Sequence, residues 1–434
     1  MEDKQPAQVT LHGVAHGGEA VGRLDDLVTF AGFGLPGERV ALEVLERKPR
    51  YLKGRVVEVL QASPDRVTAP CPIFGTCGGC HWQHASYEAQ LRLKTEVLHD
   101  QLLRLGKLEA VPIEPAVPSP REWHYRNTVQ LVPVPGVHRL LGFQRSHSHE
   151  PVAVEHCYIS DELINRVIHD APWGSLSDAS WERLSAVELR VVPEAAAQVT
   201  LIGRHPLTQT ESRRFVRAAR AALPELAGVL EAPGRDRDPA PLWGSTSLTY
   251  HLADCPLEVP AGAFMQVNVG AAERLVALLL EWLQPSPTDT LVDLYAGVGT
   301  FSVPLSKMVQ TVTAVEAHPL AAGALVRNAA LNEQTNVLVH TEAVEQALPR
   351  LGGRTDLVIL DPPRRGCTPA ALAGVARLEP RRIAYVSCEP STLARDLRLL
   401  GEAGYRPLRV CAVDLFPQTY HLESVTLLER PLTP

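Results

Sequence analysis

The chain has 434 residues, a length that suits roughly three globular domains. Hydrophobic residues make up 45% and charged residues 21%, and the 30 glycines and 36 prolines show no period, so the composition excludes fibrous and repeat architectures. The formal net charge of -7 argues against a general nucleic-acid binder, so any nucleic-acid surface must be a local patch.

The amino terminus, residues 1–6, lacks the basic start and apolar run of a secretory signal. The longest apolar stretch, residues 275–283, is interrupted by Glu281 and is far shorter than the ~20 residues that a membrane helix needs. The 8 cysteines do not make a disulfide scaffold in a chain of this length. We therefore expect a cytoplasmic protein without a membrane partner, and a monomer by default.

Short strand-like runs between residues 9 and 60, separated by glycine-rich turns, are typical of a small β-barrel. Residues 1–62 resemble the TRAM domain, an OB-like barrel of RNA-modifying enzymes, and the resemblance implies RNA binding. The basic segment 47–55 contains five cations and Tyr51, which can meet phosphates and stack on a base. It is our best candidate for RNA contact, with a solvated loop as the alternative.

Three cysteines follow within ten residues: Cys71, Cys77 and Cys80. Their spacing places three thiolates on one loop, and in a reducing compartment this pattern indicates a metal site. The fourth ligand must come from elsewhere, and the candidates are Cys157, Cys255, Cys367 and Cys411. Four thiolates would hold an iron-sulfur cluster or a tetrahedral zinc ion, and spacing alone does not separate the two. His81 and His84 are alternative zinc ligands.

Residues 63–260 form the predicted central domain, a mixed α/β unit that carries the cysteine cluster and contacts RNA. Leucines at 91, 98, 102 and 105 predict an amphipathic helix over residues 86–106 that serves packing. Further on, a row of arginines along one predicted helix either touches RNA or forms a solvated helix face. They are Arg213, Arg214, Arg217 and Arg220.

Strand-like runs alternate with helical segments from residue 261 to residue 434. This alternation predicts a parallel, doubly wound, Rossmann-like sheet. The predicted fold class is therefore α/β, with an OB-like barrel in front and a mixed α/β domain carrying a metal cluster between them.

A glycine turn lies between Asp293 and Thr300, after the first strand of this region, and Glu316 ends the second strand. Such a turn lets the backbone approach a ligand, and the acid can accept hydrogen bonds from ribose hydroxyls. Ser302 stands where a dinucleotide site would have glycine, and a Gly-Lys-Ser/Thr loop is missing, so nicotinamide nucleotides and nucleoside triphosphates fit poorly. S-adenosylmethionine, which has no phosphate, remains, with Asp361 near its sulfonium.

Cys388 directly follows the strand-like run 382–387, at a strand end where α/β sheets bind ligands. A lone cysteine there is more often a small buried residue. The glycine turn, Asp361 and Glu423 make a reacting thiol the better interpretation, so we assign Cys388 as a nucleophile.

The chain resembles the S-adenosylmethionine-dependent RNA uracil-5-methyltransferases, in particular the ribosomal RNA branch with a TRAM domain and an iron-sulfur cluster. The resemblance includes segments 264–268, 293–299, 361–366, 387–396 and 421–425. It implies Cys388 as nucleophile and Glu423 as base. It implies donor contacts by Gln266, Tyr295, Glu316 and Asp361. It also implies a four-iron four-sulfur cluster on Cys71, Cys77, Cys80 and Cys157. Glu389 and Thr300 stand where the family usually has asparagine.

Carbon 5 of uracil is a poor nucleophile, and addition of a thiolate to carbon 6 converts the ring into an enolate that can attack a methyl group. Glu423 would then remove the proton on carbon 5, after which the thiolate leaves. Cys388 must therefore be both nucleophile and leaving group, which suits a thiol whose surroundings favour the thiolate. We expect a uridine of large-subunit ribosomal RNA, in a loop or flipped from its stack, with transfer RNA as the alternative.

Two other functions fit part of the pattern. An amino-methyltransferase would use Asp361, Pro362 and Pro363 to grip its target nitrogen, but such sites normally place an aromatic residue where this chain has Arg364. A non-catalytic metal-dependent RNA-binding protein would leave the donor-site acids unexplained. A requirement of the activity for the Cys388 thiol would exclude the amino-methyltransferase. Binding of S-adenosylmethionine would exclude the non-catalytic RNA-binding protein.

Overall fold

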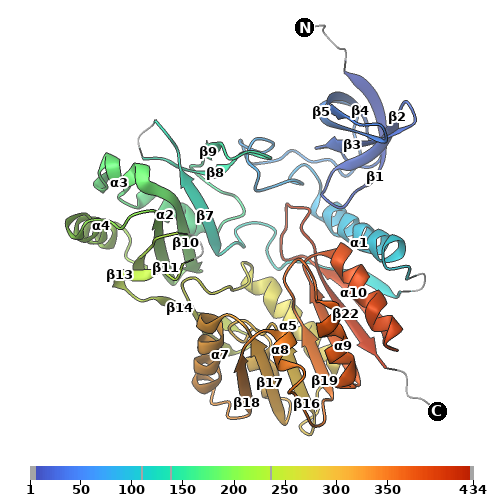
Figure 1. Ribbon diagram of the computed structural model, residues 1–434. Helices are drawn as coiled ribbons and strands as arrows, with labels where there is room; N and C mark the ends of the chain where they lie inside the picture. The colour runs from blue at the N-terminus through green and yellow to red at the C-terminus, as the bar shows by residue number, and fades with distance from the viewer. Residues whose placement is uncertain (1–5, 109–110, 137–138, 235–236, 431–434) are drawn as a thin grey trace.

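The computed structural model describes residues 6–108, 111–136, 139–234 and 237–430 (Figure 1). A closed barrel, a seven-stranded sheet and an eight-stranded sheet organise the chain, and a two-stranded hairpin accompanies them. In Figure 1 the barrel and the seven-stranded sheet stand apart from one another above the eight-stranded sheet. The two large sheets are the frames on which the sites described below are built.

The amino-terminal sheet closes into a barrel with the strand order β1-β2-β3-β5-β4. Side chains such as Val9, Leu11, Val40 and Leu42 fill its interior, because alternate residues of a strand face the same side. The predicted barrel is confirmed. Its strands are β1 (Ala7–Val14), β2 (Ala20–Leu24), β3 (Leu27–Gly32), β4 (Arg39–Arg47) and β5 (Tyr51–Gln61).

The basic segment 47–55 is mostly strand rather than loop, since only residues 48–50 lie between β4 and β5. Several of its cations have acidic neighbours: Lys48 lies 3.0 Å from Glu46, and Arg55 lies 3.0 Å from Glu43. Exposed pairs of this kind contribute only ~0–1 kcal/mol, so a phosphate could replace the carboxylates at little cost. RNA contact by this hairpin stays a prediction.

The middle of the chain forms a seven-stranded sheet with the order β13-β12-β11-β10-β7-β8-β9. Trp173, Trp181 and Phe215 lie in the core between this sheet and its helices. The strands are β7 (Thr128–Pro133), β8 (Leu141–Gln144), β9 (Pro151–Ala153), β10 (Leu184–Val192), β11 (Ala196–Gly203), β12 (Leu226–Ala232) and β13 (Ala240–Gly244). The helices are α2 (Glu162–Asp170), the 3-10 turn η1 (Trp173–Ser175), α3 (Asp178–Arg183) and α4 (Gln209–Ala222).

The carboxyl-terminal sheet has the order β18-β17-β16-β19-β20-β22-β21-β6. β16 to β20 are parallel, and β22 runs antiparallel to both β20 and β21. Its strands are β16 (Thr290–Leu294), β17 (Thr311–Glu316), β18 (Val337–Thr341), β19 (Leu357–Leu360), β20 (Arg382–Ser387), β21 (Arg406–Val413) and β22 (Glu423–Glu429). Its helices are α5 (Val269–Leu283), α6 (Ser302–Ser306), α7 (Pro319–Leu331), α8 (Val344–Ala347), α9 (Pro369–Arg377) and α10 (Pro390–Glu402).

Alternate strand residues of this sheet belong to two different hydrophobic cores. Leu291 and Val312 pack with α5, α6 and α7, whereas Val292 and Leu294 pack with α8, α9 and α10. A parallel sheet covered by helices on both faces is the doubly wound arrangement, so the predicted α/β class is confirmed.

Parts of the range 63–260 belong to the carboxyl-terminal sheet rather than to the central domain. The predicted amphipathic helix is α1 (Tyr87–Arg104), and it packs beside α10. β6 (Ile113–Val117) pairs in parallel with β21 and covers an edge whose N–H and C=O groups would otherwise lack partners. The hairpin of β14 (Ser247–Leu252) and β15 (Cys255–Pro260) packs in the core with α5. The local sequence pattern carries no information about these distant partners, so the predicted range 63–260 included segments that pack in the carboxyl-terminal domain.

None of the helices in the described ranges combines the length and the apolar character needed to cross a bilayer.

Candidate active site

A cavity of about 710 Å³ lies beyond the carboxyl ends of β16, β17, β19 and β20. Ligands bind at this edge of α/β sheets, because the turns that follow the strands face one crevice. All the residues that were predicted to react or to hold the donor line this single cavity. They are Gln266, Tyr295, Glu316, Asp361, Cys388 and Glu423.

The pairing of β20 with β22 places Cys388 beside Glu423. The two strands are antiparallel, with Ser387 opposite Ser424. Cys388 follows β20 and Glu423 begins β22, so one further step of the same register sets the two residues at one point of the sheet edge. A shared reaction centre requires this arrangement.

The surroundings of Cys388 keep its thiol protonated in the free protein. Burial, and then the nearby Glu423 and Asp361 carboxyls, raise the pKa of Cys388 to about 12, while Arg364 acts in the opposite direction. The expectation that the surroundings favour the thiolate is therefore wrong here, because lost hydration and negative neighbours both disfavour another anion. A cation that enters the cavity would shift the balance towards the thiolate.

Glu423 is a buried carboxyl that faces the cavity. It is only 3% exposed, and its Oε1 has no hydrogen-bond partner among the described residues. Burial and, after it, Asp361 raise the pKa of Glu423 well above its usual value. A buried acid without a partner stays protonated until a ligand changes its surroundings, so Glu423 is suited to exchange a proton with a bound molecule.

The turn after β16 builds the donor side of the cavity. Tyr295 and Gly297 have φ angles of 66° and 58°, and Gly299 has φ 96°. A Cβ atom on Gly299 would approach a valine methyl group to 2.9 Å, so glycine is required there. Glu316 accepts hydrogen bonds from Gly297 N at 2.8 Å and His318 N at 2.7 Å. These bonds fix the carboxylate beside the turn, where its remaining lone pairs can meet ribose hydroxyls.

Asp293 lies behind the cavity wall and interacts with Asp361. Its Oδ2 accepts a hydrogen bond from Ser302 Oγ, and its Oδ1 has no partner in the described part of the chain. Burial raises the pKa of Asp293 to about 7. Burial and the neighbouring Asp293 raise the pKa of Asp361 to about 7 as well. Sequence reasoning did not assign Asp293 to the site, although an acid inside an apolar strand is the signal that marks it.

Sequence reasoning also gave no role to Arg364, Phe416 and His421, which line the cavity. Burial, followed by Arg364, lowers the pKa of His421 to about 3, so its imidazole is neutral near pH 7. Its ring lies 4.5 Å from the ring of Tyr420. Because residues two apart in an extended chain face the same side, the position of His421 before Glu423 is the signal that could have found it.

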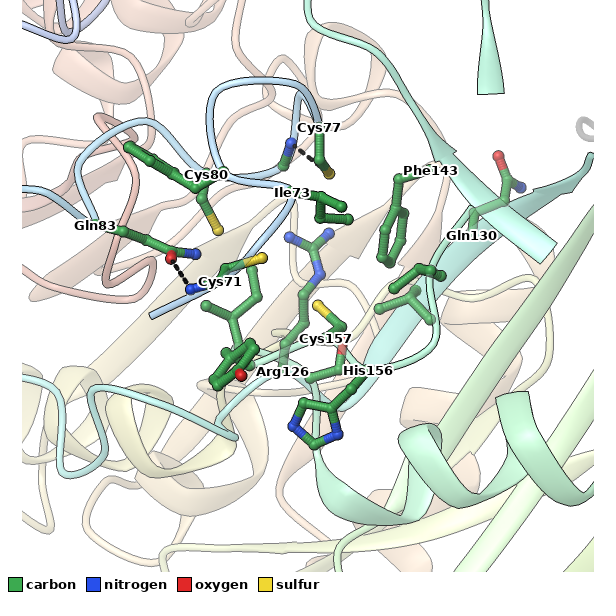
Figure 2. Close-up of a pocket in the computed structure, with 17 residues that line it drawn as sticks. Cys71, Ile73, Cys77, Cys80, Gln83, Arg126, Gln130, Phe143, His156 and Cys157 are labelled. Atoms are coloured by element: carbon green, nitrogen blue, oxygen red, sulfur yellow. Dashed lines mark hydrogen bonds between the residues drawn. The ribbon is translucent and has the colours of Figure 1, made fainter. Parts of the chain in front are cut away.

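The four predicted cysteine ligands line a second cavity, of about 220 Å³ (Figure 2). Cys71, Cys77 and Cys80 come from the loop before α1, and Cys157 comes from the segment between β9 and α2. Asn165 of α2 holds this segment, since Cys157 N donates to Asn165 Oδ1 at 2.8 Å and Asn165 Nδ2 donates to Cys157 O at 3.2 Å. The other candidates for the fourth ligand lie in the cores of the carboxyl-terminal domain: Cys255, Cys367 and Cys411.

The sulfurs of these cysteines are not gathered as closely as the ligands of a single zinc ion. A Zn–S bond of ~2.3 Å places the sulfurs of a tetrahedral site ~3.8 Å apart. Within the described ranges, no three of the cysteine sulfurs all lie within 4.8 Å of one another. The alternative zinc ligands are directed elsewhere, because the ring of His81 meets that of Tyr420 edge-to-face, with centroids 4.5 Å apart, and His84 Nε2 lies 3.5 Å from Gly34 O.

A tighter group of ligand atoms is formed by His124, His156 and Glu162, all within 4.8 Å of one another. His124 Nδ1 lies 3.1 Å from Glu162 Oε1, at the first turn of α2. His156 and Glu162 are exposed, and exposed side chains of these types commonly lie together without a metal.

The family described as tRNA (Uracil-5-)-methyltransferase matches residues 253–431, and the TRAM domain matches residues 5–57. An uncharacterised RNA methyltransferase of Halalkalibacterium halodurans is 34% identical over 443 residues, which cover 97% of this chain and 96% of the relative. Another, from Caldanaerobacter subterraneus subsp. tengcongensis, is 34% identical and covers 98% of both chains. The chain belongs to the RNA uracil-5-methyltransferase family.

A solved structure shares the fold of this family member over almost its whole length. It is the tRNA (uracil-54, C5)-methyltransferase of Pyrococcus abyssi in complex with S-adenosyl-L-homocysteine. The TM-score is 0.74 at 23% identity, and the match covers 97% of this chain and 100% of the other. At 23% identity the similarity shows a shared fold and nothing further. Together with the family assignment, it makes this protein an S-adenosylmethionine-dependent RNA methyltransferase with an amino-terminal TRAM barrel.

We predict that binding of S-adenosylmethionine expels protons from the acidic cavity. In the free protein the pKa values of Asp293 and Asp361 are about 7. A bound sulfonium favours the ionised carboxylates and so lowers these pKa values. Affinity should therefore rise as the pH increases from about 5 to 7, by up to about tenfold per pH unit for each proton that these two carboxyls release. Titration calorimetry of S-adenosylmethionine binding, in buffers of different ionisation enthalpy, measures the number of protons released.

Asp361→Asn should reduce this proton release. Glu273→Gln, which changes an exposed carboxylate on α5, is the matched control and should leave it unchanged. Proton uptake on binding, or an affinity that falls between pH 5 and 7, would contradict the prediction.

Proposed function

We propose that this protein transfers a methyl group from S-adenosylmethionine to carbon 5 of a specific uridine in RNA, with Cys388 as nucleophile and Glu423 as base. The observation that carries the proposal is the shared cavity, in which Cys388 and Glu423 lie with the donor-side acids Glu316 and Asp361. Methyl transfer to an amino nitrogen would require no thiol at this place. A non-catalytic RNA-binding protein would require neither the thiol nor the base.

The reaction begins when Cys388 Sγ forms a bond to carbon 6 of the uracil. The thiol must first lose its proton to solvent, and Arg364 together with the cationic donor favours this loss by lowering the pKa of Cys388 from its raised value. Addition places the electron pair of the ring double bond on carbon 5 as an enolate. Carbon 5 then attacks the methyl group, and the sulfonium leaves as a neutral thioether.

Glu423 completes the reaction by removing the remaining proton from carbon 5. The electrons of that C–H bond restore the ring double bond and release Cys388 as a thiolate. The raised pKa of Glu423 makes it a stronger base than an exposed carboxylate once it is ionised, which suits the removal of a carbon-bound proton. Because Glu423 is buried and Cys388 is only partly exposed, the uridine must come from a loop or flip out of its stack to reach them.

Large-subunit ribosomal RNA is the substrate that we propose. The cysteine quartet together with the TRAM barrel supports this choice, because both resemble the ribosomal RNA branch of the family. Transfer RNA is the second candidate, favoured by the fold neighbour from Pyrococcus abyssi, which is a tRNA (uracil-54, C5)-methyltransferase. Mapping of 5-methyluridine in total RNA from cells with and without the gene decides between them.

Cys71, Cys77, Cys80 and Cys157 would hold a four-iron four-sulfur cluster. Their common cavity supports one shared inorganic group, and no three of their sulfurs lie within the 4.8 Å of one another that the ligands of a single zinc ion would, which favours the cluster. When bound, the cluster would supply a covalent link between the loop before α1 and the segment before α2. Its proposed role is structural or RNA-positioning.

We predict that Cys388→Ala and Glu423→Gln fail at different steps. Cys388→Ala removes the attacking sulfur and should lower turnover on the order of 10⁴-fold or more. Glu423→Gln leaves methyl transfer intact but cannot remove the proton, so a covalent protein–RNA adduct should accumulate. Labelled methyl donor and denaturing gels measure both outcomes.

Cys411→Ala is the control for the thiol, because Cys411 lies in a core and does not line the cavity. Full turnover by Cys388→Ala would refute the nucleophile. Clean multiple turnover by Glu423→Gln would refute the base.

For the cysteine cavity we predict that Cys157→Ser abolishes iron and sulfide incorporation under anaerobic reconstitution, since three thiolates leave one iron without its ligand. Iron and labile sulfide assays and the visible absorption of the protein measure this loss. Cys255→Ser should load normally, because Cys255 lies in a separate core. A colourless wild-type protein that holds one zinc per chain would contradict the cluster.

A further inference from the structure

The loop between β21 and β22, residues 414–422, leads directly into the strand that carries Glu423. Successive main-chain carbonyls of this loop accept hydrogen bonds from different parts of the protein. Asn268 Nδ2, next to the donor-side segment, donates to Leu415 O at 3.1 Å. Lys94 Nζ, on α1, donates to Phe416 O at 3.0 Å.

The next two carbonyls bind the central domain and the cysteine loop. Tyr125 OH donates to Pro417 O at 3.0 Å. The amides of His81 and Trp82, which directly follow the third cysteine of the loop, donate to Gln418 O at 2.9 and 3.0 Å. Carbonyls 415 to 418 are therefore all held, and a loop fixed at so many successive points has little freedom.

Gln90 on α1 locks the end of this series. Its side chain is fully buried. Gln90 Nε2 donates to Gln418 Oε1 at 2.9 Å, and Gln90 Oε1 accepts from Gln418 N at 2.8 Å. The two N–H groups of the same Nε2 are shared with two further acceptors, Trp82 O at 3.2 Å and Ala85 O at 3.0 Å. The side-chain amide of Gln90 thus joins the 414–422 loop to the residues that follow Cys80, and every polar group of this side chain has a hydrogen-bond partner.

Lys94 lies one helical turn further along the same face of α1. Its Nζ donates to Asp414 Oδ1 at 2.6 Å, and both side chains are 1% exposed. A buried ion pair adds little net stability compared with an apolar pair, but breaking it leaves an uncompensated charge. Such a pair permits one loop position and penalises the alternatives.

The far end of the loop delivers side chains into the catalytic cavity. Gln418 adopts φ 69°, so the chain turns sharply at the point where Gln90 holds it. Beyond this turn the ring of Tyr420 lies 4.5 Å from that of His81, and His421 and Glu423 line the cavity. Glu423 is the first residue of β22, where it pairs with Val413 of β21, so a shift of the loop at residue 418 would act on it through the two preceding residues, His421 and Leu422.

We propose that Gln90 and Lys94 are positioning residues, which hold the 414–422 loop so that Glu423 meets the carbon 5 proton and which tie that loop to the cysteine cavity. The inference rests on the proposed role of Glu423 as the base. Cys388 is carried by β20 and not by the loop, so adduct formation and methyl transfer survive a displaced loop. Proton removal is the step that suffers.

The test uses Gln90→Met, which keeps a similar volume but removes every hydrogen bond of the amide. Affinities for S-adenosylmethionine and RNA should stay within about twofold, because the donor side and Cys388 are untouched. Turnover should fall on the order of 10- to 100-fold, as expected for a misplaced catalytic group. The covalent protein–RNA adduct should accumulate on denaturing gels, which a general loss of stability would not cause.

Gln418→Asn provides a second variant from the other side of the contact. Asparagine tolerates the positive φ angle but is too short to reach Gln90. Hydrogen exchange at the amides of His81, Trp82 and Gln418 should accelerate together in both variants. Glu96→Gln, on the exposed face of α1, is the control and should change neither exchange nor adduct level.

The outcomes separate this inference from the proposed function. If Glu423→Gln traps the adduct but Gln90→Met and Gln418→Asn do not, the positioning role is wrong while the base assignment stands. If Glu423→Gln itself traps no adduct, both fail. Unchanged protection of the three amides in both variants would also overturn the positioning role.

Discussion

The antiparallel pairing of β22 with β20 sets Cys388 and Glu423 at the same edge of the sheet, and the rest of the cavity surrounds that pair. Parallel strands of a doubly wound sheet all end at this edge, and the reversed strand β22 begins there. A strand from the end of the chain therefore contributes an acid to a site that is otherwise built from strand ends. A slip of one residue would turn Glu423 to the other face of the sheet, so the chemistry depends on this register.

The cavity is electrostatically incomplete without a cation. Burial raises the pKa values of Asp361 and Glu423, with a further increase from Asp293 in the first case and from Asp361 in the second. Burial, followed by Glu423 and Asp361, also raises the pKa of Cys388. One sulfonium acts on all of these groups in the same direction, because it favours each anionic form. In the proposed reaction the methyl donor thereby favours ionisation of the Cys388 thiol, whose addition to carbon 6 activates carbon 5 of the uracil for methylation. A protonated thiol in the absence of the donor also protects the free protein from unproductive thiolate chemistry.

The parts of the site that sequence reasoning found are those carried by short motifs at strand ends, such as Glu316, Asp361 and Cys388. A residue at a strand end has its direction fixed by the fold class, so the motif and the alternation of elements suffice to place it. The thiol of Cys388 was misjudged because its pKa depends on neighbours from other strands. The range 63–260 was predicted as the central domain, but β6 within it pairs with β21 of the carboxyl-terminal sheet. The position of an edge strand depends on a partner that is distant in the sequence, so the local sequence pattern did not reveal it.

Glu389 stands where the family usually has asparagine, and its contacts with distant parts of the chain explain this difference. Glu389 caps α10, since its Oε1 accepts from Ser391 N at 3.3 Å, which is a role that the asparagine usual in the family could also fill. Unlike asparagine it also carries a charge, and His16 Nε2 of the barrel lies 3.4 Å away. The neighbouring barrel glycine, Gly18, accepts a hydrogen bond from Trp82 Nε1 at 2.9 Å. The turn between β1 and β2 thus contacts both the start of α10, which follows Cys388, and Trp82, which follows the three cysteines of the loop before α1. These contacts join the barrel to the carboxyl-terminal domain directly.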